Sequence, residues 1–160
     1  MTRRRLAWFL LLLAALVLLP IGLVVWNEVK LATGKEVLLE VRPVDPNDPF
    51  RGEYVALSYP IARTRLPAGV GTGDTVYVVL VPGDRVWRAA GVVRDRPARG
   101  TFIRGRAGGF PGIEFGIETF YVEEGDARRY EDAIRRGAVE AKVVLDDGGG
   151  AKLRDLLIRE

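Results

Sequence analysis

The sequence predicts an N-terminal single transmembrane helix followed by a mainly-β (α+β) ectodomain. Three observations favour this fold class. No residue from Leu6 to Val25 is charged. Most of the chain after residue 35 alternates apolar and polar residues, which is typical of half-buried strands. A single stretch near residues 127–136 has helical periodicity instead. We expect the strands to form an antiparallel sheet, either barrel-like or a sandwich.

The apolar run is the first element. At about 1.5 Å rise per residue, Leu6 to Val25 spans roughly 30 Å, the thickness of a hydrocarbon core. Trp8 and Trp26 lie near its two ends, where indole rings favour the membrane interface. A membrane helix tolerates a proline such as Pro20 when the freed carbonyl finds another partner. We therefore predict a transmembrane helix at residues 6–26.

The charges around this run predict its orientation. Arg3, Arg4 and Arg5 precede it, and the positive-inside rule keeps such a segment in the cytoplasm. We expect residues 1–5 in the cytoplasm and 27–160 as an extracytoplasmic β-rich domain. The predicted location is the bacterial cytoplasmic membrane, with the lipid bilayer as a partner. The alternative is a cleaved signal peptide, but the run is longer than a usual signal core and no A-x-A-like site follows it.

Charge and composition limit the function classes. The chain has 24 Lys and Arg against 21 Asp and Glu, with a pI near 9.4. The three arginines before the apolar run account for the whole excess, so the pI does not indicate a nucleic-acid partner. The chain has no Cys, so no disulfide stabilises the predicted domain. Its core must hold it together by packing alone.

Alternation and turn signals locate the strands in order. Val37, Leu39 and Val41 alternate with polar residues in the first strand. Gly- and Pro-containing turns separate the later ones. The expected strands cover residues 37–41, 54–59, 75–81, 86–93, 101–106, 114–122 and 139–145. Residues 152–158 are the expected hairpin partner of the last strand, although Leu153, Leu156 and Leu157 also fit a helical stripe.

The one short helix is expected near residues 127–136. Asp126 precedes it as a candidate N-cap, and Gly137 follows it as a candidate C-cap. Ala127, Tyr130 and Ile134 fall on one face at helical spacing. This helix would pack its apolar face on the sheet and leave its charged face in solvent.

The chain offers little for catalysis. It has no His and no Cys, which excludes a Ser-His-Asp triad, a Cys-His pair and an imidazole metal site. The only serine, Ser58, lies in the middle of an expected strand. It could act only with a lysine as its base, and the candidates are Lys30, Lys35, Lys142 and Lys152. We therefore expect no catalytic residue, no metal and no cofactor. A signal-peptidase-like Ser-Lys hydrolase using Ser58 is kept as an alternative.

The stretch "DPFRGEYVALSYP" at 48–60 is the most distinctive part of the sequence. Asp45 and Asp48 belong to a proline-rich turn that leads into the strand of this stretch, and either can pair with Arg51. Gly52 permits a backbone conformation that a side chain would resist. Tyr54 and Tyr59 fall on opposite faces of the following strand. A structural corner is the preferred interpretation, while a ligand site and a protein-binding edge stay open. The candidate motif or binding residues are Arg51, Gly52, Glu53, Tyr54, Leu57 and Tyr59.

The motif "RGEYVALSY" resembles the signature of the GDYXXLXY family. Gly52, Tyr54, Leu57 and Tyr59 match it, and Glu53 stands where the family usually has Asp. Three longer blocks are also similar to the family, at residues 33–61, 114–125 and 130–158. Glu123 departs from the pattern, because a Pro is expected there. The resemblance therefore covers nearly the whole chain.

The resemblance implies no established activity. It implies a single-pass anchored ectodomain and, through kinship, a multi-pass membrane protein as a partner. We therefore expect a membrane-anchored, extracytoplasmic, non-enzymatic module that binds a membrane or envelope partner. The alternatives are the Ser58 hydrolase and a binder of a small envelope ligand.

Overall fold

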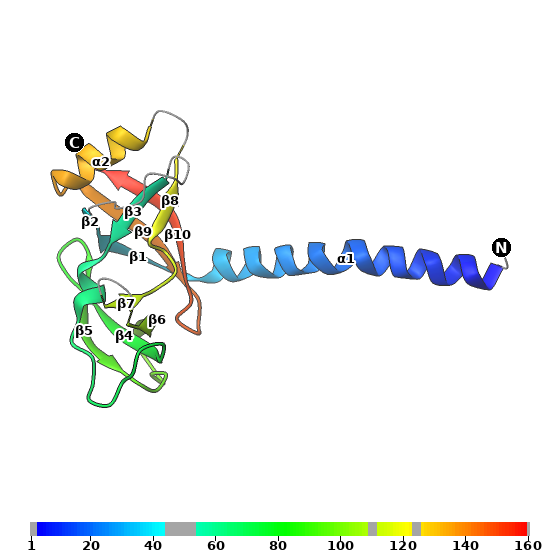
Figure 1. The fold of residues 1–160 in the computed structure, drawn as a ribbon, viewed down its shortest axis with the longest axis horizontal. Helices are drawn as coiled ribbons and strands as arrows, with labels where there is room; N and C mark the ends of the chain where they lie inside the picture. The colour runs from blue at the N-terminus through cyan, green and yellow to red at the C-terminus, as the bar shows by residue number, and fades with distance from the viewer. Residues whose placement is uncertain (1–2, 44–53, 109–111, 123–125, 160) are drawn as a thin grey trace. The chain divides into compact units, whose positions relative to one another are not determined.

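A computed structural model describes residues 3–43, 54–108, 112–122 and 126–159. The chain divides into two compact units, Met1–Gly34 and Lys35–Glu160. Figure 1 shows the elements of each unit along the chain.

The first unit is one helix, α1 (Arg3–Thr33), with Pro20 inside it. The helix continues past the apolar run at both ends and includes Arg3 and Lys30. Its described side chains are exposed, among them Leu16 at 73%.

The predicted transmembrane helix at residues 6–26 needs correction. Among the residues that the structure describes, no helix has both the length and the apolar character to cross a membrane. This finding contradicts the predicted transmembrane span and signal anchor, and with them the single-pass location in the bacterial cytoplasmic membrane. It also contradicts the lipid bilayer and a multi-pass membrane protein as partners.

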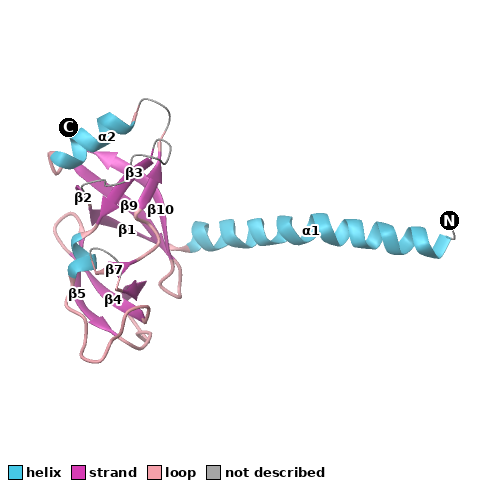
Figure 2. Cartoon of the chain, viewed as in Figure 1, coloured by secondary structure: helices cyan, strands magenta, loops and turns pink. Residues whose placement is uncertain are grey.

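The second unit is mainly β, and all its strand pairs are antiparallel. Apart from the short helix α2 (Ala127–Arg135) and the 3-10 turn η1 (Pro60–Arg63), its described elements are strands (Figure 2). The first sheet has the order β1-β9-β10, the second β2-β3-β8 and the third β5-β4-β6-β7. The strands are β1 (Lys35–Glu40), β2 (Arg42–Pro43), β3 (Tyr54–Ser58), β4 (Thr75–Pro82), β5 (Trp87–Val93), β6 (Thr101–Ala107), β7 (Ile113–Glu114), β8 (Thr119–Tyr121), β9 (Val139–Leu145) and β10 (Ala151–Ile158).

The barrel-like alternative is wrong for the described residues, because none of the three sheets closes on itself. Strands β2, β7 and β8 have only two or three residues each. The sheets instead share one hydrophobic core.

The expected strand at residues 114–122 is two strands in the structure. Strand β7 pairs with β6, whereas β8 pairs with β3 in another sheet. Gly116 lies between them with φ +80°, a conformation that a non-glycine residue rarely adopts. The chain changes sheets at this residue.

The core follows the predicted alternation. Val37, Leu39 and Val41 are almost fully buried, and so are Val76 and Val78 of β4. The central strand β9 is buried on both faces over most of its length, and β1 and β10 pair with its two edges. Packing of this apolar surface is what stabilises a domain that has no disulfide.

Helix α2 lies where the sequence predicts it and packs against β2, β3 and β9. The predicted N-cap is wrong, because Asp126 has helical backbone angles and its side chain makes no capping hydrogen bond. The predicted C-cap is confirmed: Gly137 has φ +66°, and its N–H donates to the carbonyl of Ile134.

The predicted hairpin at the end of the chain is also confirmed. Strands β9 and β10 pair with each other, with a register shift between Leu153 and Asp155. Asp146 organises the turn, because its Oδ1 accepts the N–H groups of Gly148 at 2.8 Å and Gly150 at 2.7 Å. The helical alternative for this segment is thereby excluded.

Substitution of Gly105 by Ala tests the packing between β6 and β7. A Cβ atom at Gly105 would lie 2.9 Å from the Glu114 carbonyl oxygen and 2.9 Å from the Phe115 ring, and would collide with Ile113. We expect Gly105→Ala to lower the free energy of unfolding by about 1–3 kcal/mol. The matched control is Gly91→Ala in β5, where a Cβ would meet nothing within 4 Å. Equal denaturation midpoints for the two variants would contradict the described contact.

Candidate functional site

The distinctive motif of the sequence lies on β3 and the residue that follows it. The structure describes Tyr54, Leu57 and Tyr59. The other predicted residues, namely Asp45, Asp48, Arg51, Gly52 and Glu53, lie outside the described residues. The predicted turn and its ion pair are therefore not placed by the structure.

Leu57 and Tyr59 are parts of the hydrophobic core. Leu57 and the Tyr59 ring are both nearly inaccessible to solvent, and Tyr59 is 1% exposed. The Tyr59 hydroxyl donates a hydrogen bond of 2.7 Å to the carbonyl oxygen of Ile117. Burial raises the pKa of the Tyr59 hydroxyl well above its ordinary value, and the negative charge of Glu118 raises it further. This tyrosine is therefore a neutral hydrogen-bond donor across the core, out of reach of a ligand.

Tyr54 is placed differently. It is half-buried and lies directly opposite Tyr121 in the pairing of β3 with β8. Directly opposite residues of an antiparallel pair have side chains on the same face. Tyr121 is 80% exposed, so the two tyrosines lie on a face that is open to solvent. The neighbouring Phe120 points the other way, and its ring packs edge-on against Tyr130 of α2 at 5.8 Å between centroids.

Strand β8 is an edge strand of its sheet among the described residues, because the order of that sheet is β2-β3-β8. An edge strand leaves a row of backbone N–H and C=O groups available for pairing with another chain. The exposed Tyr121 lies on this edge strand, and the half-buried Tyr54 lies beside it on the neighbouring strand β3. We call Tyr54, Thr119 and Tyr121 the β8 edge.

Ser58 is in a poor position for a nucleophile. It is 2% exposed and ends β3, directly opposite Arg42 of β2. A base must lie within hydrogen-bond reach of the serine. Lys35 instead donates to the Thr101 hydroxyl at 2.8 Å, and Lys142 pairs with Glu36 at 3.2 Å.

No metal centre is visible in the described part of the chain, where no group of three His, Cys, Asp or Glu side chains is close enough to hold an ion. Several of the described glutamates make other contacts. Glu118, for example, accepts the N–H of Phe115 at 2.6 Å.

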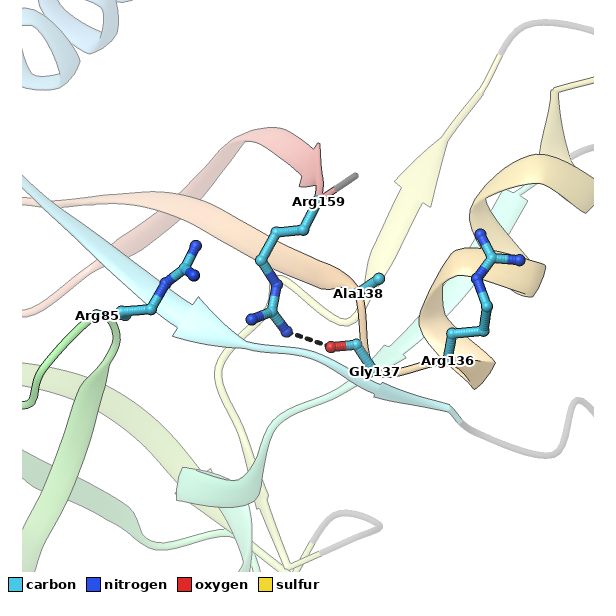
Figure 3. A pocket seen from close by; sticks show the side chains of 5 residues that line it. All are labelled: Arg85, Arg136, Gly137, Ala138 and Arg159. Atoms are coloured by element: carbon cyan, nitrogen blue, oxygen red, sulfur yellow. Dashed lines mark hydrogen bonds between the residues drawn. The ribbon is translucent and has the colours of Figure 1, made fainter.

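The structure forms one arrangement that the sequence reasoning missed. A pocket of about 660 Å³ is lined by Arg85, Arg136, Gly137, Ala138 and Arg159. These residues come from the loop before β5, the end of α2 and the end of β10 (Figure 3). No local pattern in the sequence joins them, because the arginines are separated by more than twenty residues in each case.

A comparison with protein families identifies the chain. A family model described as "GDYXXLXY protein" matches residues 16–156. The match covers most of the chain, so the chain belongs to this family. No curated protein and no solved structure matches the chain.

Substitution of Tyr59 by Phe tests the hydrogen bond across the core. The variant keeps the ring and removes only the hydroxyl, which leaves the Ile117 carbonyl without its donor. We expect the free energy of unfolding to fall by about 1–3 kcal/mol, the usual cost of an unmet buried polar group. Tyr121→Phe is the matched control, and we expect it to be unchanged because Tyr121 is exposed. Chemical denaturation measures both.

The effect of Tyr59→Phe on the free energy of unfolding should also depend on pH. An unfolded chain loses the phenolic proton near pH 10, whereas burial raises the pKa of Tyr59 in the folded state. The stabilisation by the neutral phenol is therefore complete below about pH 10 and is lost as the pH rises further. The difference in unfolding free energy between the wild type and Tyr59→Phe should narrow above about pH 10. A difference that stays constant up to about pH 11 would argue against a buried hydroxyl.

Proposed function

We propose that this member of the GDYXXLXY family is a non-enzymatic module that binds an extended segment of another protein along the β8 edge. The observation that carries the proposal is the exposure of Tyr121 on an edge strand, directly opposite Tyr54. Tyrosine is enriched at protein interfaces, because it combines a large apolar ring with a polar hydroxyl.

The geometry of β8 supports pairing with a strand of the partner. One side of β8 pairs with β3, from Tyr54–Tyr121 to Ala56–Thr119. An added strand would pair with the other side through backbone hydrogen bonds, as in β-strand addition. The Tyr54 and Tyr121 rings would then contact the partner's side chains. On the opposite face of β8, the Phe120 ring packs against Tyr130 of α2 and stabilises the position of the strand.

The placement of Ser58 supports a non-enzymatic role. Its hydroxyl lies in a nearly solvent-free position, whereas acylation requires a substrate carbonyl to reach the nucleophile. The chain has no His or Cys to supply another of the common nucleophile and base pairs.

A serine-directed acylating probe tests the non-enzymatic part. We expect intact-mass measurement of the folded protein to show no adduct after incubation with a fluorophosphonate, because Ser58 is buried. The Ser58→Ala variant serves as the control for reaction at other hydroxyl groups. A stoichiometric adduct on the wild type that disappears in Ser58→Ala would overturn this part of the proposal.

Site-specific photocrosslinking tests the binding edge. A photoreactive phenylalanine derivative replaces Tyr121 in the full-length protein, in the cells that naturally produce it. We expect ultraviolet light to yield one discrete adduct with another protein. Replacement of Tyr54 by Ala in the same chain should weaken the adduct several-fold, because the ring beside position 121 is lost.

The matched control carries the photoreactive residue at Val93. This side chain is 39% exposed on β5, which is an edge strand of the third sheet. We expect no adduct at this position. The same adducts from positions 93 and 121, or none from position 121, would count against the β8 edge as the binding surface.

A further inference from the structure

The pocket described above concentrates positive charge. Arg85, Arg136 and Arg159 line it together with Gly137 and Ala138, and the lining includes no carboxylate. In Figure 3 the Arg85 side chain points toward that of Arg159, while Arg136 lies beyond the turn at Gly137. Three arginines from separate parts of the chain therefore line the pocket, and the side chains of Arg85 and Arg159 approach each other most closely in this view.

A buried carboxylate holds two of these arginines together. The Glu140 side chain is 8% exposed, and its Oε1 lies 3.6 Å from Nε of Arg85 and 3.5 Å from Nε of Arg159. One carboxylate therefore balances only one of two guanidinium charges. Both arginines contact Glu140 through Nε, so the terminal nitrogens of Arg85 can donate hydrogen bonds to another acceptor. Those of Arg159 also serve the Gly137 carbonyl, which accepts a hydrogen bond from Nη2.

The neighbouring acids are engaged elsewhere. Glu40 lies directly opposite Glu140 in the pairing of β1 with β9, but it pairs with Arg42 at 3.1 Å. Glu131 and Asp132 of α2 both contact Arg135. Within the described part of the chain, the Arg136 side chain has no hydrogen bond or ion pair. Among the described residues that line the pocket or form an ion pair with its lining, three arginines face the single carboxylate of Glu140, which leaves an excess of two positive charges.

We propose that this pocket binds the phosphate group of a small organic phosphate. A phosphate monoester carries about 1.5–2 negative charges at pH 7, which matches the excess of the pocket. Guanidinium groups donate in a planar fork that suits phosphate oxygens. The oxyanion would lie against Arg85 and Arg159, and Arg136 adds positive charge on the other side. The volume of about 660 Å³ is within the range of small-molecule sites, so it leaves room for an organic group as well as the phosphate.

Isothermal titration calorimetry of the full-length protein tests this site. The probes are glycerol phosphate and inorganic phosphate, at constant ionic strength, with chloride as the reference anion. We expect saturable binding of one glycerol phosphate per chain and weaker binding of inorganic phosphate. Heats that do not saturate with either phosphate would overturn the proposal. Tighter binding of inorganic phosphate than of the ester would overturn the choice of an organic phosphate.

Two substitutions of opposite expected effect connect the binding to the pocket. Arg85→Gln should weaken glycerol phosphate binding at least 5-fold, while Arg159 still pairs with Glu140 and maintains the fold. Arg88→Gln is the matched control, because Arg88 is an exposed arginine of the adjacent strand that does not line the pocket. Glu140→Gln should tighten binding several-fold, since it removes the competing carboxylate. Thermal melting verifies that each variant is folded. Equal weakening by Arg85→Gln and Arg88→Gln would mean general charge attraction and would overturn the site.

This site is separate from the β8 edge, and no residue belongs to both. The outcome of the calorimetry is therefore independent of the crosslinking result. The anion site can be present whether or not β8 pairs with a strand of another protein.

Discussion

The buried hydrogen bond of the Tyr59 hydroxyl joins the two points where the chain leaves and re-enters the second sheet, and the arrangement of the domain depends on this connection. Tyr59 follows β3, and its acceptor Ile117 precedes β8, so the hydrogen bond joins residues 58 positions apart. Between Tyr59 and Ile117 the chain forms all four strands of the third sheet, β4 to β7, and then returns to the second sheet at β8. The phenol supplies an apolar ring for the core and a donor for a carbonyl that would otherwise lack it. A phenylalanine in this position would fill the same space without fixing where the chain returns.

Much of the fold could be predicted because alternation is a local signal. Val37, Leu39 and Val41 identify a strand face whatever the partner strand is, and the burial of these residues follows directly. Pairing depends on residues far apart, which local patterns do not contain. The segment at 114–122 shows the difference, because its residues all suit a strand, yet Gly116 divides them between two sheets. The N-terminal run shows another limit, since its composition predicts a span that the described part of the helix does not support.

The candidate site could be predicted only in part. The motif was visible in the sequence, and the opposite faces of Tyr54 and Tyr59 follow from a period of two. Which face is buried depends on what covers the strand, and the sequence does not specify it. Tyr121 could not be paired with Tyr54 from sequence, because that pairing is set by the register of β3 and β8. The arginine pocket has no local signal at all, since its residues meet only through the end of β10 and the turn after α2.

The distribution of charge explains why composition concealed this pocket. Of 24 Lys and Arg, three precede the apolar run, and the remainder equals the 21 Asp and Glu. The balance is not uniform over the surface, because the acids are used in local pairs. Glu36 alone contacts both Lys142 and Arg154, and the pKa of its carboxyl is lowered, first by its hydrogen bond with Lys142. Where two arginines share the single carboxylate of Glu140, the local excess is positive although the charges after the apolar run sum to zero. A neutral sum therefore coexists with a site that attracts anions, and screening by salt limits that attraction to within about 10 Å.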